Sequence, residues 1–169
     1  IACQPMVDSL GEHATTLFLT TVFGAGMPAA VREDLRRRAS SASPVILAPP
    51  GGTSFLGLEA FLDGVRRALD ADAHGHFVLS SGNTAYVQLY EEAVAVLASG
   101  WRKRVFSLPA GLRDHVGSVL RLIGGAAPAA AVVRSGWGYK YYSPERAHQA
   151  LAWTPRQSLR ELLGRSILS

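Results

Sequence analysis

The sequence predicts an α/β protein with one main domain. Short apolar runs rich in β-branched residues alternate along the chain with longer segments whose apolar residues recur at helical spacing, a pattern typical of α/β folds. The chain has 169 residues, of which 48% are hydrophobic and 18% are charged. A chain of this length and composition buries one core, and its composition argues against long disordered tails.

The first half of the chain predicts strands and helices in turn. Residues 3–13 have the composition of a helix. Thr15–Phe23 is rich in β-branched and aromatic residues and predicts one buried strand that ends at Gly24-Ala25-Gly26. We then expect a helix at 28–39, a strand at 44–48, an extended piece at 53–56, a helix with the apolar stripe Leu58, Phe61, Leu62, Val65 and Leu69, and a strand at 76–80.

The second half predicts more helix than strand. Ser81–Thr84 has the residues of a turn that caps a helix at 85–98. A short strand at 104–108 and a helix from Pro109 to about Ile123 follow, and residues 132–142 are aromatic and in part extended. Ser143 is the expected N-cap of a short helix that ends near Trp153, and Ser158 the start of a final helix to about Ile167.

Composition excludes several classes of function. The longest apolar stretches fall well short of the roughly 18 residues that a membrane span needs, so we expect no membrane partner. Cys3 is the single cysteine, which favours a reducing compartment, the cytoplasm. The net charge is +4, and Arg36–Arg38 has no aromatic residues between its charges, so we prefer a solvated helix face to nucleic-acid binding. His74 and His76 lack a third ligand at useful spacing, so we expect no metal.

Four segments follow, in order, the motif pattern of a known family. Leu17–Gly26 is similar to an LRPxxVYGPG strand and loop, and Gly52–Glu59 to an RxFVHVxD segment. Phe77–Gly82 is similar to an FNLGSG turn, and Ser143–Leu159 to a terminal SKARRELGWxPxxSLEEGL motif. The chain therefore resembles extended short-chain dehydrogenases/reductases of the nucleotide-sugar epimerase, dehydratase and dihydroflavonol-reductase type, over nearly its whole length.

The resemblance implies the carboxyl-terminal part of a Rossmann-type parallel sheet with a small, mostly helical substrate-binding region. It implies a single partial domain over 1–169, in which 1–100 contain the end of the sheet with intervening substrate-domain elements. Residues 101–169 are then mainly the substrate-binding region and the terminal helices. The implied cofactor contacts are Leu19, Thr20 and Val22, and the implied substrate contacts are Thr21, Phe23, Gly24, Phe55 and Arg134.

The same family carries out hydride transfer with NAD or NADP. Its acid/base is the Tyr of a YxxxK motif, whose Lys lowers the pKa of the phenol. No Tyr in this sequence is followed four residues later by Lys, and no TGxxGxxG turn follows a strand. Ile1 aligns at or just past the position of the family's Lys, so we expect a truncated product or a fragment. We expect no catalytic residue in the chain and no NAD or NADP binding by the chain alone.

Two positions depart from the family pattern. Thr53 stands where the family has Arg, and Gly57 where it has His or Tyr. A phosphate-binding cation and an aromatic wall are therefore missing. These departures favour a substrate without a nucleotide, or a degenerate member of the family. Arg134 is a candidate replacement charge, and a solvated surface Arg is the alternative we prefer.

Two hypotheses about function follow. The first is the substrate-binding portion of an NAD(P)-dependent epimerase, dehydratase or reductase that acts on a sugar or a hydroxy/keto small molecule. The second is a non-catalytic small-molecule binding or interaction module derived from the same fold. Because the strand at Thr15–Phe23 would otherwise expose an apolar edge, the expected partners are a missing amino-terminal Rossmann half or another chain. A small-molecule substrate is expected as well, and a homo-oligomer is a further alternative.

Overall fold

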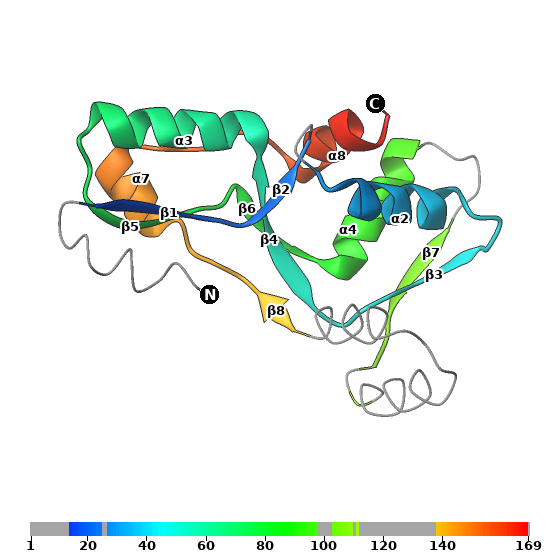
Figure 1. Ribbon diagram of the computed structural model, residues 1–169. Coiled ribbons are helices and arrows are strands. Elements are labelled where there is room, and N and C mark those ends of the chain that lie inside the picture. Colours follow the sequence, from blue (N-terminus) through cyan, green and yellow to red (C-terminus); the bar gives the residue numbers. More distant parts are fainter. Residues whose placement is uncertain (1–13, 25–26, 98–102, 110, 112–137, 169) are drawn as a thin grey trace.

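The computed structural model describes residues 14–24, 27–97, 103–109, 111 and 138–168 (Figure 1). Its strands are β1 (Thr15–Leu19), β2 (Thr21–Phe23), β3 (Val45–Ala48), β4 (Gly52–Gly57), β5 (Gly75–Leu79), β6 (Gly82–Ala85), β7 (Arg104–Ser107) and β8 (Tyr139–Lys140). Its helices are α2 (Ala29–Ser40), α3 (Leu58–Asp70), α4 (Tyr86–Leu97), α7 (Glu145–Leu151) and α8 (Leu159–Ile167). The predicted α/β class is confirmed. The helix predicted at 3–13 and most of the one from Pro109 to Ile123 lie outside the described residues.

The strands form three small groups. β1 and β5 pair in parallel, with Leu17 opposite Phe77. β4 lies between β2 and β6, parallel to β2 and antiparallel to β6, and its first residues also pair with β8. β3 and β7 form a separate parallel pair. In Figure 1, α3 runs along β1 and β5, while α2, α4 and α8 gather around the end of the molecule where β2 ends.

Two apolar clusters hold these groups together. The first joins β2 and β4 to α2, α4 and α8, and includes Phe23, Phe55 and Leu162. The second packs β5 against α3 and α7 around the fully buried Trp153. The Trp153 indole donates a hydrogen bond of 3.0 Å to the carbonyl of Ala60 in α3. The terminal segment therefore anchors the long helix to the sheet.

The face of α3 that packs on the core differs from the predicted one. Its buried residues are Ala60, Gly64 and Ala68, whereas Leu62 and Leu69 of the predicted stripe are 57% and 76% exposed. A Cβ on Gly64 would lie 2.9 Å from Leu79 Cδ1. The small residues let the helix backbone come close to β5, and the Trp153 ring supplies the bulk that larger side chains usually provide.

The prediction of one buried strand over Thr15–Phe23 is wrong. Thr20 interrupts it, and the two pieces join different sheets because β1 pairs with β5 and β2 with β4. β1 is also far from buried, since Phe18 and Leu19 are both exposed. An apolar strand with this exposure has an uncovered surface.

Of the predictions for local structure, two are wrong and one is confirmed. Residues 82–85 are not a turn but β6, because they pair with β4 from Gly52↔Ala85 to Phe55↔Gly82. The N-cap of α7 is Pro144, and the Ser143 hydroxyl accepts a hydrogen bond from the Glu145 amide instead. The prediction for the last helix is confirmed, since Ser158 caps α8. No helix in the described part of the chain has both the length and the apolar character needed to cross a membrane.

Candidate functional site

A pocket lies beside the carboxyl ends of the parallel strands β1 and β5. Its volume is about 140 Å³. Phe18, Leu19, Thr20, Val78 and Tyr142 line it. In open α/β sheets, ligands bind in the crevice outside the carboxyl ends of the strands. This pocket is therefore the candidate site of the chain.

Two hydrogen bonds fix the walls of the pocket. The Thr20 hydroxyl donates to the carbonyl of Leu79 at 3.2 Å, which holds the end of β1 against the end of β5. The Tyr142 backbone amide donates to Ser54 Oγ at 2.8 Å. Ser54 Oγ also contacts Asn83 Oδ1 and lies 3.3 Å from the carbonyl of Lys140. Tyr142 is thus carried to the pocket by its attachment to β4.

Aromatic residues continue from the pocket along residues 139–142, which we call the tyrosine segment. The rings of Tyr139 and Tyr141 lie 5.2 Å apart, tilted by 60°. The Tyr141 ring packs so close to Gly52 that a Cβ there would overlap with it, so this approach requires glycine. Burial and the nearby Tyr141 raise the pKa of Tyr86, and desolvation with the nearby Tyr139 raises the pKa of Tyr141. These two phenols are therefore protonated at neutral pH and are able to donate hydrogen bonds.

The predicted cofactor contacts are only partly brought together. Leu19 and Thr20 line the pocket. Val22 belongs to β2, pairs with Leu56 of β4 and is not among the lining residues. The cofactor roles of these three residues stay predictions.

The predicted substrate contacts are dispersed. Thr21 Oγ1 lies 2.9 Å from Thr53 Oγ1, while Phe23 and Phe55 are both buried and meet edge to face in the core, with centroids 6.3 Å apart. The amide of Gly24 donates to Ser166 Oγ at 2.6 Å, and the φ of Gly24 is +93°, which favours glycine. Arg134 lies outside the described residues. Thr21, Phe23, Gly24 and Phe55 do not line the candidate pocket, and the substrate roles of all five residues stay predictions.

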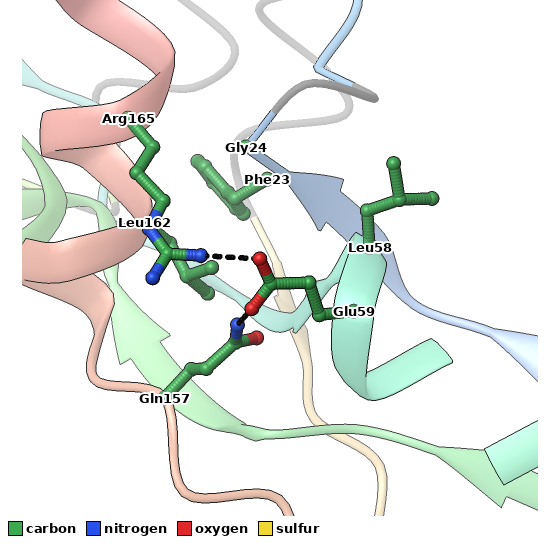
Figure 2. A pocket seen from close by; sticks show the side chains of 7 residues that line it. All are labelled: Phe23, Gly24, Leu58, Glu59, Gln157, Leu162 and Arg165. Atoms are coloured by element: carbon green, nitrogen blue, oxygen red, sulfur yellow. Dashed lines mark hydrogen bonds and ion pairs between the residues drawn. The ribbon is translucent and has the colours of Figure 1, made fainter. Parts of the chain in front are cut away.

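Figure 2 shows a second cavity, also of about 140 Å³, between the first turn of α3 and α8. Phe23, Gly24, Leu58, Glu59, Gln157, Leu162 and Arg165 line it. Glu59 accepts from Arg165 at 2.7 Å and from Gln157 Nε2 at 2.6 Å. The Gln157 carbonyl oxygen lies where a Cβ on Gly57 would be. The absent side chain at position 57 thus makes room for Gln157, and the polar rim connects the two helices.

Sequence reasoning missed Phe18 and Tyr142 as lining residues. The signal available was the run of tyrosines at 139–142, which indicates an extended aromatic segment but not the strand it lies against. Within the described ranges, no group of three or more His, Cys, Asp or Glu side chains is placed to hold a metal ion. The candidate site is therefore built from aromatic, aliphatic and hydroxyl groups.

Neither a known family model nor a curated protein sequence matches the chain, but solved structures do. The structure of gox2253 matches with a TM-score of 0.73 and 17% identity, over 99% of this chain and 52% of gox2253. PA4631, a nucleoside-diphosphate-sugar epimerase from Pseudomonas aeruginosa, matches with a TM-score of 0.69 and 14% identity, over 98% of this chain and 51% of the epimerase. The fold is that of the extended short-chain dehydrogenases/reductases.

A third match includes a bound cofactor. The Bordetella bronchiseptica enzyme WbmH, in complex with NAD⁺, matches with a TM-score of 0.67 and 18% identity, over 99% of this chain and 48% of WbmH. The chain thus spans about half the length of each of these three proteins. The resemblance predicted from four sequence segments is confirmed for the fold, including its Rossmann-like character.

Proposed function

We propose that this chain is the substrate-binding portion of an NAD(P)-dependent epimerase, dehydratase or reductase that acts on a sugar or a hydroxy/keto small molecule. The observation that carries the proposal is the pocket at the carboxyl ends of β1 and β5, where the predicted cofactor contacts Leu19 and Thr20 meet Tyr142. Structures with the same fold that contain NAD⁺ or NADPH support it.

The pocket suits the ring of a nicotinamide and not its phosphates. Its volume is close to that of a cavity of about 150 Å³ that accepts benzene, and three of its five lining residues, Phe18, Leu19 and Val78, are apolar. These side chains give the pocket an apolar wall, and the hydrogen bond from Thr20 fixes the strand ends. None of the lining residues is a cation or a glycine, so the pyrophosphate would be held elsewhere. When bound, a nicotinamide cofactor supplies or accepts hydride.

The partners form part of the same proposal. β1 has a strand partner on one side only within the described residues, and Phe18 and Leu19 are exposed. A two-stranded parallel sheet is marginal alone, since parallel sheets are normally covered on both faces. We take the covering part to be an amino-terminal Rossmann half or another chain, with a homo-oligomer as the alternative. We place the protein in the cytoplasm.

The proposal is tested by cofactor binding to two polypeptides. One is the 169-residue chain and the other includes whatever coding sequence precedes Ile1 in the same reading frame. NADH fluorescence should show micromolar binding to the longer polypeptide and none to the shorter. In the longer one, Leu19→Glu places a charge on the pocket wall and should weaken binding at least about tenfold, because an apolar contact is replaced by a charge that loses water when the ring binds.

Leu47→Glu is the matched control. Leu47 lies on β3 and is 52% exposed, close to the 48% of Leu19, so the same charge at similar exposure should leave NADH binding unchanged. Equal loss in both variants would show a general effect of the charge. A start codon directly before Ile1, or a preceding sequence without a glycine-rich loop and a YxxxK motif, would favour the non-catalytic binding module instead.

A further inference from the structure

Ser54 is a buried hydroxyl residue in the middle of β4. It is 0% exposed, and it lies directly opposite Asn83 of β6 in the antiparallel pair. A buried hydroxyl lowers stability unless its hydrogen bonds are satisfied, whereas a methyl group at the same place needs no partner. A serine at this place is therefore explained by the groups that its hydroxyl binds.

The Ser54 hydroxyl has one proton to donate and two lone pairs with which to accept. It accepts a hydrogen bond from the Tyr142 backbone amide at 2.8 Å. Two acceptors compete for its proton, namely Asn83 Oδ1, in close contact, and the carbonyl of Lys140 at 3.3 Å. The closer acceptor takes the proton. Asn83 thus fixes the direction of the hydroxyl and leaves a lone pair for the Tyr142 amide.

The bond to Ser54 holds a connection that belongs to no helix or strand. β8 ends at Lys140 and α7 begins at Glu145, so residues 141–144 lie between them. The Tyr142 amide ties this connection to β4. Because the Tyr142 side chain is 50% exposed, its neighbours surround it only in part. The place of its ring at the pocket therefore depends on the backbone bond to Ser54.

We propose that Ser54, oriented by Asn83, is a positioning residue for the cofactor ring. It fixes the backbone at Tyr142 so that the tyrosine ring forms one wall of the candidate pocket. The other lining residues belong to β1, to β5 or to Thr20 between β1 and β2, so Tyr142 is the wall that comes from a distant segment. Ser54 does not line the pocket and acts through Tyr142. The inference rests on the proposed function, because it names how a wall of the same site is held.

The first measurement needs no cofactor. Hydrogen exchange of the Tyr142 amide is followed in ¹H–¹⁵N spectra of the 169-residue chain. Ser54→Ala removes the acceptor and should speed this exchange about 2- to 13-fold, the range that corresponds to one hydrogen bond. Asn83→Ala retains the acceptor but frees the hydroxyl, so it should speed the exchange by a smaller factor. Asn83 is exposed, so this variant carries the test if Ser54→Ala loses its cooperative thermal transition.

The second measurement is ligand binding by the longer polypeptide described above. Tyr142→Ala should weaken NADH binding about 2- to 13-fold, as expected for the loss of one aromatic contact. Ser54→Ala should weaken it by no more than that, and Ser54→Thr, which retains the hydroxyl, should restore it. The double variant should match Tyr142→Ala alone, because two changes that act through one contact are not additive. ADP-ribose lacks the nicotinamide, so its binding should stay unchanged in every variant.

Ser166→Ala is the matched control. Ser166 is a buried serine, 1% exposed, and its Oγ also accepts a hydrogen bond from a distant backbone amide, that of Gly24 at 2.6 Å. Ser166 does not line the candidate pocket. Its replacement should leave both the exchange of the Tyr142 amide and the binding of NADH unchanged.

Any of four results would overturn the inference: unchanged exchange of the Tyr142 amide in Ser54→Ala, additive losses of NADH affinity in the double variant, equal losses of NADH and ADP-ribose affinity, or equal effects of Ser54→Ala and Ser166→Ala. Failure of the proposed function looks different, because the unmodified longer polypeptide would then bind no NADH. The role of Ser54 toward the cofactor would fail with it, whereas the exchange measurement would still show whether Ser54 holds Tyr142.

Discussion

Replacing Trp153 with alanine should remove the anchor between the terminal segment and α3. The indole is fully buried, and its N–H donates to Ala60 at 3.0 Å. Around it the second cluster contains Leu56, Phe77 and Leu79. A buried Trp→Ala change costs about 3–5 kcal/mol, because apolar contacts are lost and the cavity collapses only in part. That is a large fraction of the roughly 5–15 kcal/mol by which a protein is stable.

The measurement is urea unfolding followed by far-ultraviolet circular dichroism, which does not depend on the deleted indole. With a slope of about 2 kcal/mol per molar urea, a loss of 4 kcal/mol lowers the midpoint by about 2 M. Trp153→Phe retains most of the ring and loses the hydrogen bond to Ala60, so it should fall between the alanine variant and the original protein.

Leu69→Ala is the control from the same helix. Leu69 is large and apolar but exposed, so its loss should change the free energy of unfolding by no more than about 0.5 kcal/mol. The reasoning would be refuted if Trp153→Ala lowered the free energy of unfolding by less than about 1 kcal/mol, or by no more than Leu69→Ala. The small residues of α3 would then not be packed against the Trp153 ring as described.

Three further predictions concern single groups. Gly64→Ala gains about 1 kcal/mol of helix propensity, but its methyl group would lie 2.9 Å from Leu79, and overpacking costs about 1–3 kcal/mol. Thermal unfolding should therefore show that the variant is less stable than the original protein. A more stable variant would refute the close packing of α3 on β5. Ser158→Ala removes the capping bond that the Ser158 hydroxyl accepts from the Glu161 amide and leaves the one from the Ser158 amide to the Glu161 side chain. It should cost about 0.5–2 kcal/mol in the same assay, whereas Ser158→Asp should retain most of the stability. Burial raises the pKa of Tyr90 to about 12, so its neutral phenol stabilises the fold fully below pH 10, and this stability is lost as the pH rises from 10 towards 12. In an ultraviolet titration, Tyr90→Phe should remove a phenol that ionises near pH 12, and an unchanged curve in that range would contradict the burial of Tyr90.

Local signals in the sequence predicted local structure well. Ser158 is the predicted start of the last helix, and the structure shows it as the N-cap of α8, in a capping box with Glu161. The short helix predicted to end near Trp153 is α7, which ends at Leu151. In both cases the deciding contacts are made within a few residues.

The predictions that were wrong depended on contacts between residues far apart in the sequence. Nothing in the residues around Thr20 indicates that the strand on one side pairs with β5 and the strand on the other side with β4. The stripe of Leu62 and Leu69 has the spacing of a core face, yet the core side is set by how close β5 and Trp153 approach Gly64. The role of Tyr142 in the pocket could not be predicted for the same reason. Its position depends on the hydrogen bond from its amide to Ser54, a residue far away in the sequence.

The single residue between β1 and β2 limits how the two sheets can move. Thr20 alone joins a strand of one sheet to a strand of the other, and one residue spans at most about 3.6 Å. Two residues, Ser80 and Ser81, make a second short connection between the same sheets, from β5 to β6, and the Ser81 amide donates to the carbonyl of Phe55 in β4 at 2.7 Å. With two short links, the sheets can neither slide apart nor rotate freely at this point. Since Thr20 also lines the pocket, the pocket wall keeps a fixed place relative to both sheets.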